Sequence, residues 1–165
     1  MINTSIFLES LLQKMRFKKV RKFLQGDVLD FGGNEGELGK YVQGNYTLVN
    51  YDHAPMQNKQ FDTIVMLAVI EHIEPDAVND LFKKIGSHLK DNGILFLTTP
   101  TPASKFVLEL LAWLGFLDKQ NIEEHKHYWT KKELYELAEL SELRVEKYQS
   151  FQLGFNQWMV LRKGL

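Results

Sequence analysis

The segment at residues 61–68 (FDTIVMLA) constrains the fold most, because it is apolar along nearly its whole length. A strand with one face in water alternates apolar and polar residues, whereas a continuous apolar run is typical of a strand covered on both faces. Such strands occur in parallel sheets, whose crossover connections place helices over both faces. The run therefore predicts an α/β fold rather than an all-β or all-helical one.

Strand-like and helix-like patterns alternate along most of the chain. Apolar residues at helical spacing predict a helix over 6–24, ended by Gly26, and others beginning at Pro75, Ser104 and the capping-box residue Thr130. Strands are predicted at 27–31, 46–51, 61–68, 94–99, 144–151 and 156–162. The first four are expected to be parallel and the last two to pair as an antiparallel hairpin, which together give a three-layer α/β sandwich.

Length and composition narrow the class of protein. A chain of 165 residues fits one domain, 1–165, with an N-terminal helix in 1–25 and the core in 26–165. The 20 basic and 21 acidic side chains nearly cancel, so no nucleic-acid partner is expected. The absence of cysteine excludes thiol nucleophiles and zinc–thiolate sites. No signal peptide or transmembrane segment is recognisable, and a cytoplasmic location is expected.

The strand at 27–31 runs directly into the sequence Gly32-Gly33-Asn34-Glu35-Gly36. Ligands of parallel α/β sheets bind where strands end, and glycines let the backbone approach a ligand closely. Asn34 tolerates the positive φ of a tight loop, and Asp30 places a negative charge where an ammonium group could sit. No G-x-G-x-x-G is present, which disfavours a nicotinamide dehydrogenase. The alternative is a turn with a purely structural role.

Asp52 follows the second predicted strand. A carboxylate at this position can accept hydrogen bonds from both hydroxyls of a ribose. The alternative is an aspartate that only favours a turn. Its place after the glycine loop favours the binding role.

Four segments in order, VLDFGGNEG, YDHAP, FDTIVMLAVIEHI and LKDNGILFLTTP, resemble the class I S-adenosylmethionine-dependent methyltransferases. The resemblance covers roughly residues 25–151 and is closest to the small-molecule branch that includes the ubiquinone-biosynthesis type O-methyltransferases. It implies a Rossmann-like fold, S-adenosylmethionine as cofactor and a small-molecule, sugar or lipid-precursor acceptor methylated at oxygen. The implied cofactor-binding residues are Asp30, Gly32, Gly33, Asn34, Gly36, Asp52, Leu67 and Ala68.

The chain departs from the family pattern at two places. Asn34 stands where the family usually has glycine, and Phe61 follows Asp52 by only nine residues, where the family has a further helix–strand–helix passage. The sheet is therefore expected to have fewer strands than is usual in the family. The shortening would also leave one edge of the sheet less covered, and a homodimer could form there. Asp52 could match either the ribose acid or the adenine-side acid; ribose is favoured because 46–51 directly follows the glycine-loop helix. The rival hypothesis is a cofactor-binding or degenerate domain with a regulatory or assembly role.

The segment around His125 also resembles a family pattern, in which a histidine precedes an aromatic residue and a helix start. His125 could act as a general base for a hydroxyl acceptor, or the segment could only form a lid that caps the next helix. His127 has a weaker claim, and Glu71 and His72 are expected to be structural. Because His125 and His127 suggest no third ligand, no metal site is expected.

The helix predicted at 104–116 is unusually apolar. We expect it to pack against the sheet as part of the core. The alternative is a lid that lines a pocket for a hydrophobic acceptor.

Overall fold

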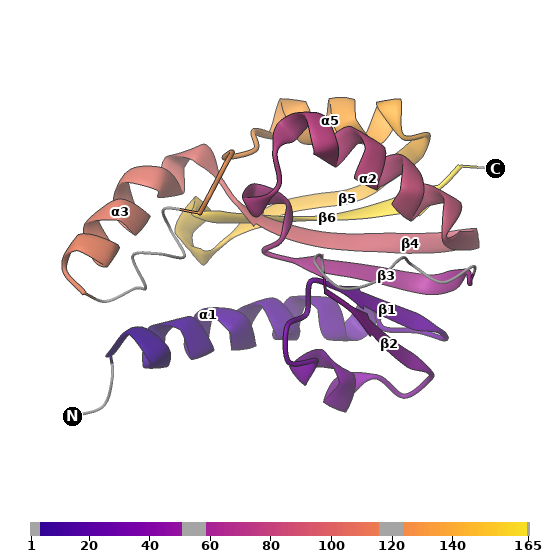
Figure 1. The fold of residues 1–165 in the computed structure, drawn as a ribbon, viewed down its shortest axis with the longest axis horizontal. Coiled ribbons are helices and arrows are strands. Elements are labelled where there is room, and N and C mark those ends of the chain that lie inside the picture. Colours follow the sequence, from indigo (N-terminus) through magenta and orange to yellow (C-terminus); the bar gives the residue numbers. More distant parts are fainter. Residues whose placement is uncertain (1–3, 51–58, 116–123, 165) are drawn as a thin grey trace.

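The computed structural model describes residues 4–50, 59–115 and 124–164, and the described strands form one sheet in the order β2-β1-β3-β4-β6-β5 (Figure 1). The strands are β1 (Val28–Phe31), β2 (Tyr46–Val49), β3 (Phe61–Leu67), β4 (Leu89–Pro100), β5 (Leu143–Phe151) and β6 (Asn156–Lys163). Strands β1 to β4 are parallel, and β6 is antiparallel to both β4 and β5. The prediction of a mostly parallel sheet with a C-terminal antiparallel hairpin is confirmed.

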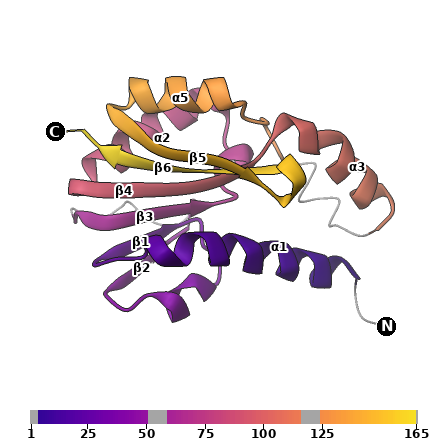
Figure 2. The ribbon, with the colours of Figure 1, turned by 180° about the vertical axis from the view of Figure 1, so that it is seen from behind.

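Helices cover both faces of this sheet (Figures 1 and 2). The helices are α1 (Thr4–Val20), α2 (Pro75–Ser87), α3 (Lys105–Trp113) and α5 (Lys131–Leu140). Side chains of α2 and α5 pack on one face, with Phe82 and Leu134 in the same buried cluster as Ile64 of β3. On the other face, Phe17 and Val20 of α1 pack in a second cluster with Val65 of β3. Successive residues of β3 thus point to opposite, equally buried faces, which explains its continuous apolar sequence.

The start of α5 follows the predicted capping box. Thr130 Oγ1 accepts a hydrogen bond from the Glu133 N–H at 3.2 Å, and the Glu133 carboxylate accepts one from the Thr130 N–H at 2.7 Å. Two of the N–H groups that a helix start leaves unpaired are satisfied in this way.

Helix α3 is where the prediction of core packing is wrong. The side chains of Phe106 and Trp113 are 73% and 78% exposed, and Leu110 is 41% exposed. The physical reason is the position of the helix: α3 extends beyond the carboxyl ends of the strands and has no sheet beneath it (Figure 1). None of the helices in the described part of the chain is long and apolar enough to cross a membrane.

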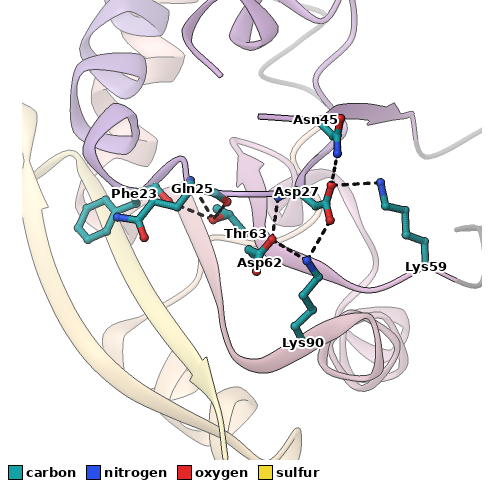
Figure 3. Close-up of polar contacts among 8 residues, drawn as sticks. All are labelled: Phe23, Gln25, Asp27, Asn45, Lys59, Asp62, Thr63 and Lys90. Carbon is teal, nitrogen blue, oxygen red and sulfur yellow. Dashed lines mark hydrogen bonds and ion pairs between the residues drawn. The ribbon is translucent and has the colours of Figure 1, made fainter. Parts of the chain in front are cut away.

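A network of paired charges closes the opposite, amino-terminal edge of the sheet (Figure 3). The Lys90 ammonium lies 2.9 Å from Asp27 and 2.7 Å from Asp62, and Asn45 donates to Asp27 at 2.6 Å. The hydrogen bonds from Asn45 and Lys90 lower the pKa of Asp27 to about 2. These groups satisfy one another, so the cluster stabilises the strand starts and leaves little to recognise a ligand.

A cavity of about 460 Å³ opens beside this network, lined in part by Asp62 and Arg162. Arg162 Nε is already bonded to Glu146 at 2.6 Å, and Asp62 to Lys90. The charged side chains that line this cavity are therefore already compensated. Ligands of parallel sheets bind at the opposite, carboxyl edge.

Candidate functional site

The glycine loop lies at the carboxyl ends of β1, β2 and β3. The Gly32 N–H donates to the carbonyl of Val49 at the end of β2, at 2.8 Å. Gly32 has φ +80°, and a Cβ there would lie 2.7 Å from the side chain of Val69. Only glycine combines that backbone conformation with so close a neighbour. The loop is therefore held against both neighbouring strands.

Asn34 and Gly36 adopt the left-handed conformation that the sequence predicts for this loop, with φ +51° and +72°. The side chain of Asn50 fixes Asn34 from across the loop: Asn50 Oδ1 accepts from the Asn34 N–H at 2.9 Å, and Asn50 Nδ2 donates to the Asn34 carbonyl at 3.0 Å. Sequence reasoning missed Asn50. Its position one residue after β2, at the same sheet edge as the loop, is the signal that could have found it.

Asp30 lies beneath the glycine loop with its side chain almost fully buried. Its Oδ2 accepts a hydrogen bond from the Tyr46 hydroxyl at 2.7 Å. A Cβ on Gly33 would lie 2.2 Å from the same oxygen, so the carboxylate is in contact with the loop backbone. Burial raises the pKa of Asp30 to about 6, against the opposing effect of the Tyr46 hydrogen bond. Asp30 is thus a buried carboxylate that is ionised at neutral pH.

Leu67 and Ala68 end β3 beside the glycine loop. Ala68 has φ +58°, which is unusual for a residue with a Cβ. Its N–H is shared between the carbonyl and the hydroxyl of Thr98, at 3.0 and 3.1 Å. Strained backbone of this kind is enriched at ligand sites. Asp52, the predicted ribose acid, lies outside the described residues.

His125 packs at the same carboxyl edge, against His72 and Tyr128. The His125 and His72 rings meet edge to face with centroids 4.7 Å apart, and His125 Nδ1 lies 3.1 Å from the Tyr128 hydroxyl. Burial, with the nearby charges of His72 and Arg16, lowers the pKa of His125 to about 4. The imidazole is therefore neutral at physiological pH and has an unprotonated nitrogen that can accept a proton.

Glu71 connects the His125 segment to the end of β3. Its backbone carbonyl accepts from the Lys126 N–H at 2.7 Å, and its buried Oε2 accepts from the Thr99 hydroxyl at 3.0 Å. Burial raises the pKa of Glu71 to about 7. These contacts fix the segment that carries His125, and a structural role for Glu71 stays the prediction.

The structure pairs the histidines differently from the arrangement considered in the sequence. His127 lies 2.9 Å from Glu133 of the capping box, whereas ligand-capable atoms of His125, His72 and Glu71 lie within 4.8 Å of one another. The positive charge of Arg16 acts on all three. The positive charge of Arg16 would repel a metal cation bound by these three side chains. The absence of a metal site stays a prediction.

Comparison with known proteins gives this geometry a family context. A model of the methyltransferase domain family matches residues 7–148. The ubiquinone biosynthesis O-methyltransferases of Rickettsia typhi and Rickettsia bellii are 26% and 25% identical over 130 residues, which is 72% and 73% of this chain. The matches cover 51% and 53% of those relatives, so the chain spans about half the length of the curated relatives it matches.

Solved structures share the fold at low sequence identity. A SAM-dependent methyltransferase from Archaeoglobus fulgidus superposes with a TM-score of 0.68 at 15% identity, covering 91% of this chain and 94% of that one. Magnesium protoporphyrin IX methyltransferase from Synechocystis, solved with bound SAH, gives 0.64 at 12% identity, with coverages of 92% and 84%. These likenesses confirm the Rossmann-like architecture. With the family model matching residues 7–148, the chain belongs to the methyltransferase domain family.

Proposed function

We propose that this protein transfers a methyl group from S-adenosylmethionine to an oxygen of a small-molecule acceptor. The observation that carries the proposal is the glycine loop at the carboxyl edge, which packs directly on the buried carboxylate of Asp30 (2% exposed). Family membership and the names of the curated relatives support the same chemistry. A sugar or lipid precursor is included in the acceptor class.

The loop has the shape and charge that the amino-acid part of this cofactor needs. A Cβ at Gly32 would strike Val69 and one at Gly33 would strike Asp30, so the loop backbone packs directly on these two side chains. The negative charge of Asp30 suits the ammonium group of the cofactor. Asn34 and Gly36 shape the same loop, and Leu67 and Ala68 border it from β3. The residues proposed to hold the cofactor are Asp30, Gly32, Gly33, Asn34, Gly36, Leu67, Ala68 and Asp52.

The bound cofactor supplies an electrophilic methyl group on a sulfonium sulfur. What the chain must add is alignment of the acceptor oxygen, exclusion of water and a destination for the hydroxyl proton. His125 is neutral and can take that proton at its free nitrogen, while its contacts with Tyr128 and His72 fix the ring. His125 is therefore the proposed general base.

A transfer assay tests the proposal directly. Labelled S-adenosylmethionine is incubated with the protein and a panel of phenols, catechols, sugars and prenylated phenols, and label is sought in the acceptor. We expect transfer to at least one hydroxyl compound. Cofactor binding without transfer to any of them would favour the rival role as a regulatory or assembly domain. A cytoplasmic location and a homodimer stay predictions of the sequence.

Replacing Asp52 by alanine is expected to weaken cofactor binding by roughly 1.5–3 kcal/mol, the scale of a hydrogen bond to a charged group. The reason is the proposed contact with the ribose hydroxyls. Calorimetric titration with S-adenosylhomocysteine (SAH) measures the loss, and the melting temperature of the variant checks the fold. Unchanged affinity in this variant would show that Asp52 is not the ribose acid.

A further inference from the structure

The proposed cofactor site contains a half-buried contact that the sequence motifs do not include. Tyr46 begins β2, and its hydroxyl donates to Asp30 Oδ2 at 2.7 Å. Burial, followed by the hydrogen bond and charge of Asp30, raises the pKa of Tyr46 above its usual value. The hydroxyl therefore keeps its proton and acts as a permanent donor to Asp30.

Tyr46 also supports the loop itself. A Cβ on Gly36 would lie 3.2 Å from the Tyr46 hydroxyl, and one on Gly39 would lie 3.0 Å from its ring. Gly33 touches the same Asp30 oxygen from above. The loop, the carboxylate and the phenol are thus stacked in contact, and a change in Tyr46 reaches the loop through Asp30.

Among the described residues around Asp30, no charged side chain can replace the phenol as hydrogen-bond donor to the carboxylate. The strands on either side place the uncharged Leu48 and Val65 opposite it. The charged side chains in the loop and in the 3-10 turn Glu37–Tyr41 that follows it are Glu35, Glu37 and Lys40. All three are exposed, and Lys40 forms an ion pair with Glu37 at 3.7 Å. Among these neighbours, Tyr46 is the group that contacts the carboxylate.

We infer that Tyr46 is a positioning residue of the cofactor site: its hydroxyl holds the Asp30 carboxylate in place and in its charged form beneath the glycine loop. The inference rests on the proposed function, because it assumes that Asp30 faces the ammonium group of the cofactor. A buried carboxylate that loses its donor takes up a proton more readily. Loss of the hydroxyl should therefore cost affinity mainly where Asp30 becomes protonated.

The test is calorimetric titration of SAH between pH 5.0 and 8.5 with wild type and Tyr46→Phe, which keeps the ring. Wild-type affinity should fall below about pH 6, the pKa of Asp30. In Tyr46→Phe this fall should begin about one pH unit higher. Binding should then be roughly twofold weaker than wild type at pH 7, roughly tenfold weaker at pH 5, and nearly equal at pH 8.5. Tyr41→Phe, which removes a hydroxyl from the preceding 3-10 turn and leaves the contact with Asp30 intact, should follow the wild-type curve.

Asp30→Asn provides a second reading that does not depend on the Tyr46 variant. It should bind weakly without the fall near pH 6, and adding Tyr46→Phe to it should change little, because the two residues act on the same contact. Two results would overturn the inference while leaving the proposed function intact. One is that SAH affinity depends on pH in the same way in wild type and Tyr46→Phe. The other is that the loss of affinity near pH 6 persists in Asp30→Asn. Absence of SAH binding by wild type at every pH would instead overturn the proposed function, and the inference with it.

Discussion

Replacing Gly33 by alanine is expected to weaken SAH binding about 100-fold while the protein stays folded. The new Cβ would lie 2.2 Å from Asp30 Oδ2 and 2.4 Å from its Cγ, so the carboxylate must move. Moving it breaks the 2.7 Å hydrogen bond from Tyr46 and misplaces the charge that faces the cofactor. A hydrogen bond to a charged group contributes about 1.5–3 kcal/mol, which sets the scale of the loss.

Gly86→Ala is the matched control for this variant. Gly86 lies in α2, where a Cβ would meet only ordinary contacts, the nearest at 3.6 Å. Alanine is favoured over glycine within a helix by roughly 0.5–1 kcal/mol, so this variant should bind SAH like wild type and melt no lower. If both glycine variants bind SAH equally well, the loop is only a turn and the cofactor lies elsewhere.

The second large effect is expected at His125. His125→Ala should lower turnover about 100-fold and leave SAH affinity nearly unchanged, because a general base typically contributes 10²–10⁴-fold in rate and acts on the acceptor. The low end is expected, since a pKa of about 4 makes the imidazole a weak base. The same value predicts that His125 remains unprotonated, and so does not limit the rate, between pH 8 and pH 5.

His127→Ala is the comparison for His125→Ala. His127 bonds to Glu133 and so supports the start of α5, which predicts a lower melting temperature with a smaller loss of turnover. The measurement is a side-by-side assay once the transfer assay has identified an acceptor. Equal turnover of wild type and His125→Ala would reduce the segment to a lid, with catalysis resting on alignment and exclusion of water alone.

The sequence predicted those features that depend on local backbone chemistry. The glycine loop was found because Gly32 and Gly36 need a positive φ, and Asn34 is the side-chain-bearing residue that tolerates it best. The capping box of α5 and the antiparallel hairpin at the end of the chain follow from equally local patterns. Such features need no knowledge of distant partners.

The rest depended on contacts between segments far apart in the chain. Tyr46 reaches Asp30, and Asn50 reaches Asn34, only because β1 and β2 pair in one particular register. Residue type alone does not specify that register. Helix α3 shows the converse: its apolar pattern indicates burial, but the pattern cannot say whether a sheet lies beneath. Trp113 is exposed because α3 extends beyond the carboxyl ends of the strands (Figure 1).

The most direct test of the central claim is calorimetric titration of the wild-type protein with SAH at pH 7.5. A cofactor site at the carboxyl edge predicts saturable binding of one SAH per chain, with a dissociation constant on the order of micromolar, equivalent to about −8 kcal/mol. Repeating the titration with Gly33→Ala ties the signal to the glycine loop. Absence of binding at millimolar SAH, or binding that Gly33→Ala leaves untouched, would contradict the account.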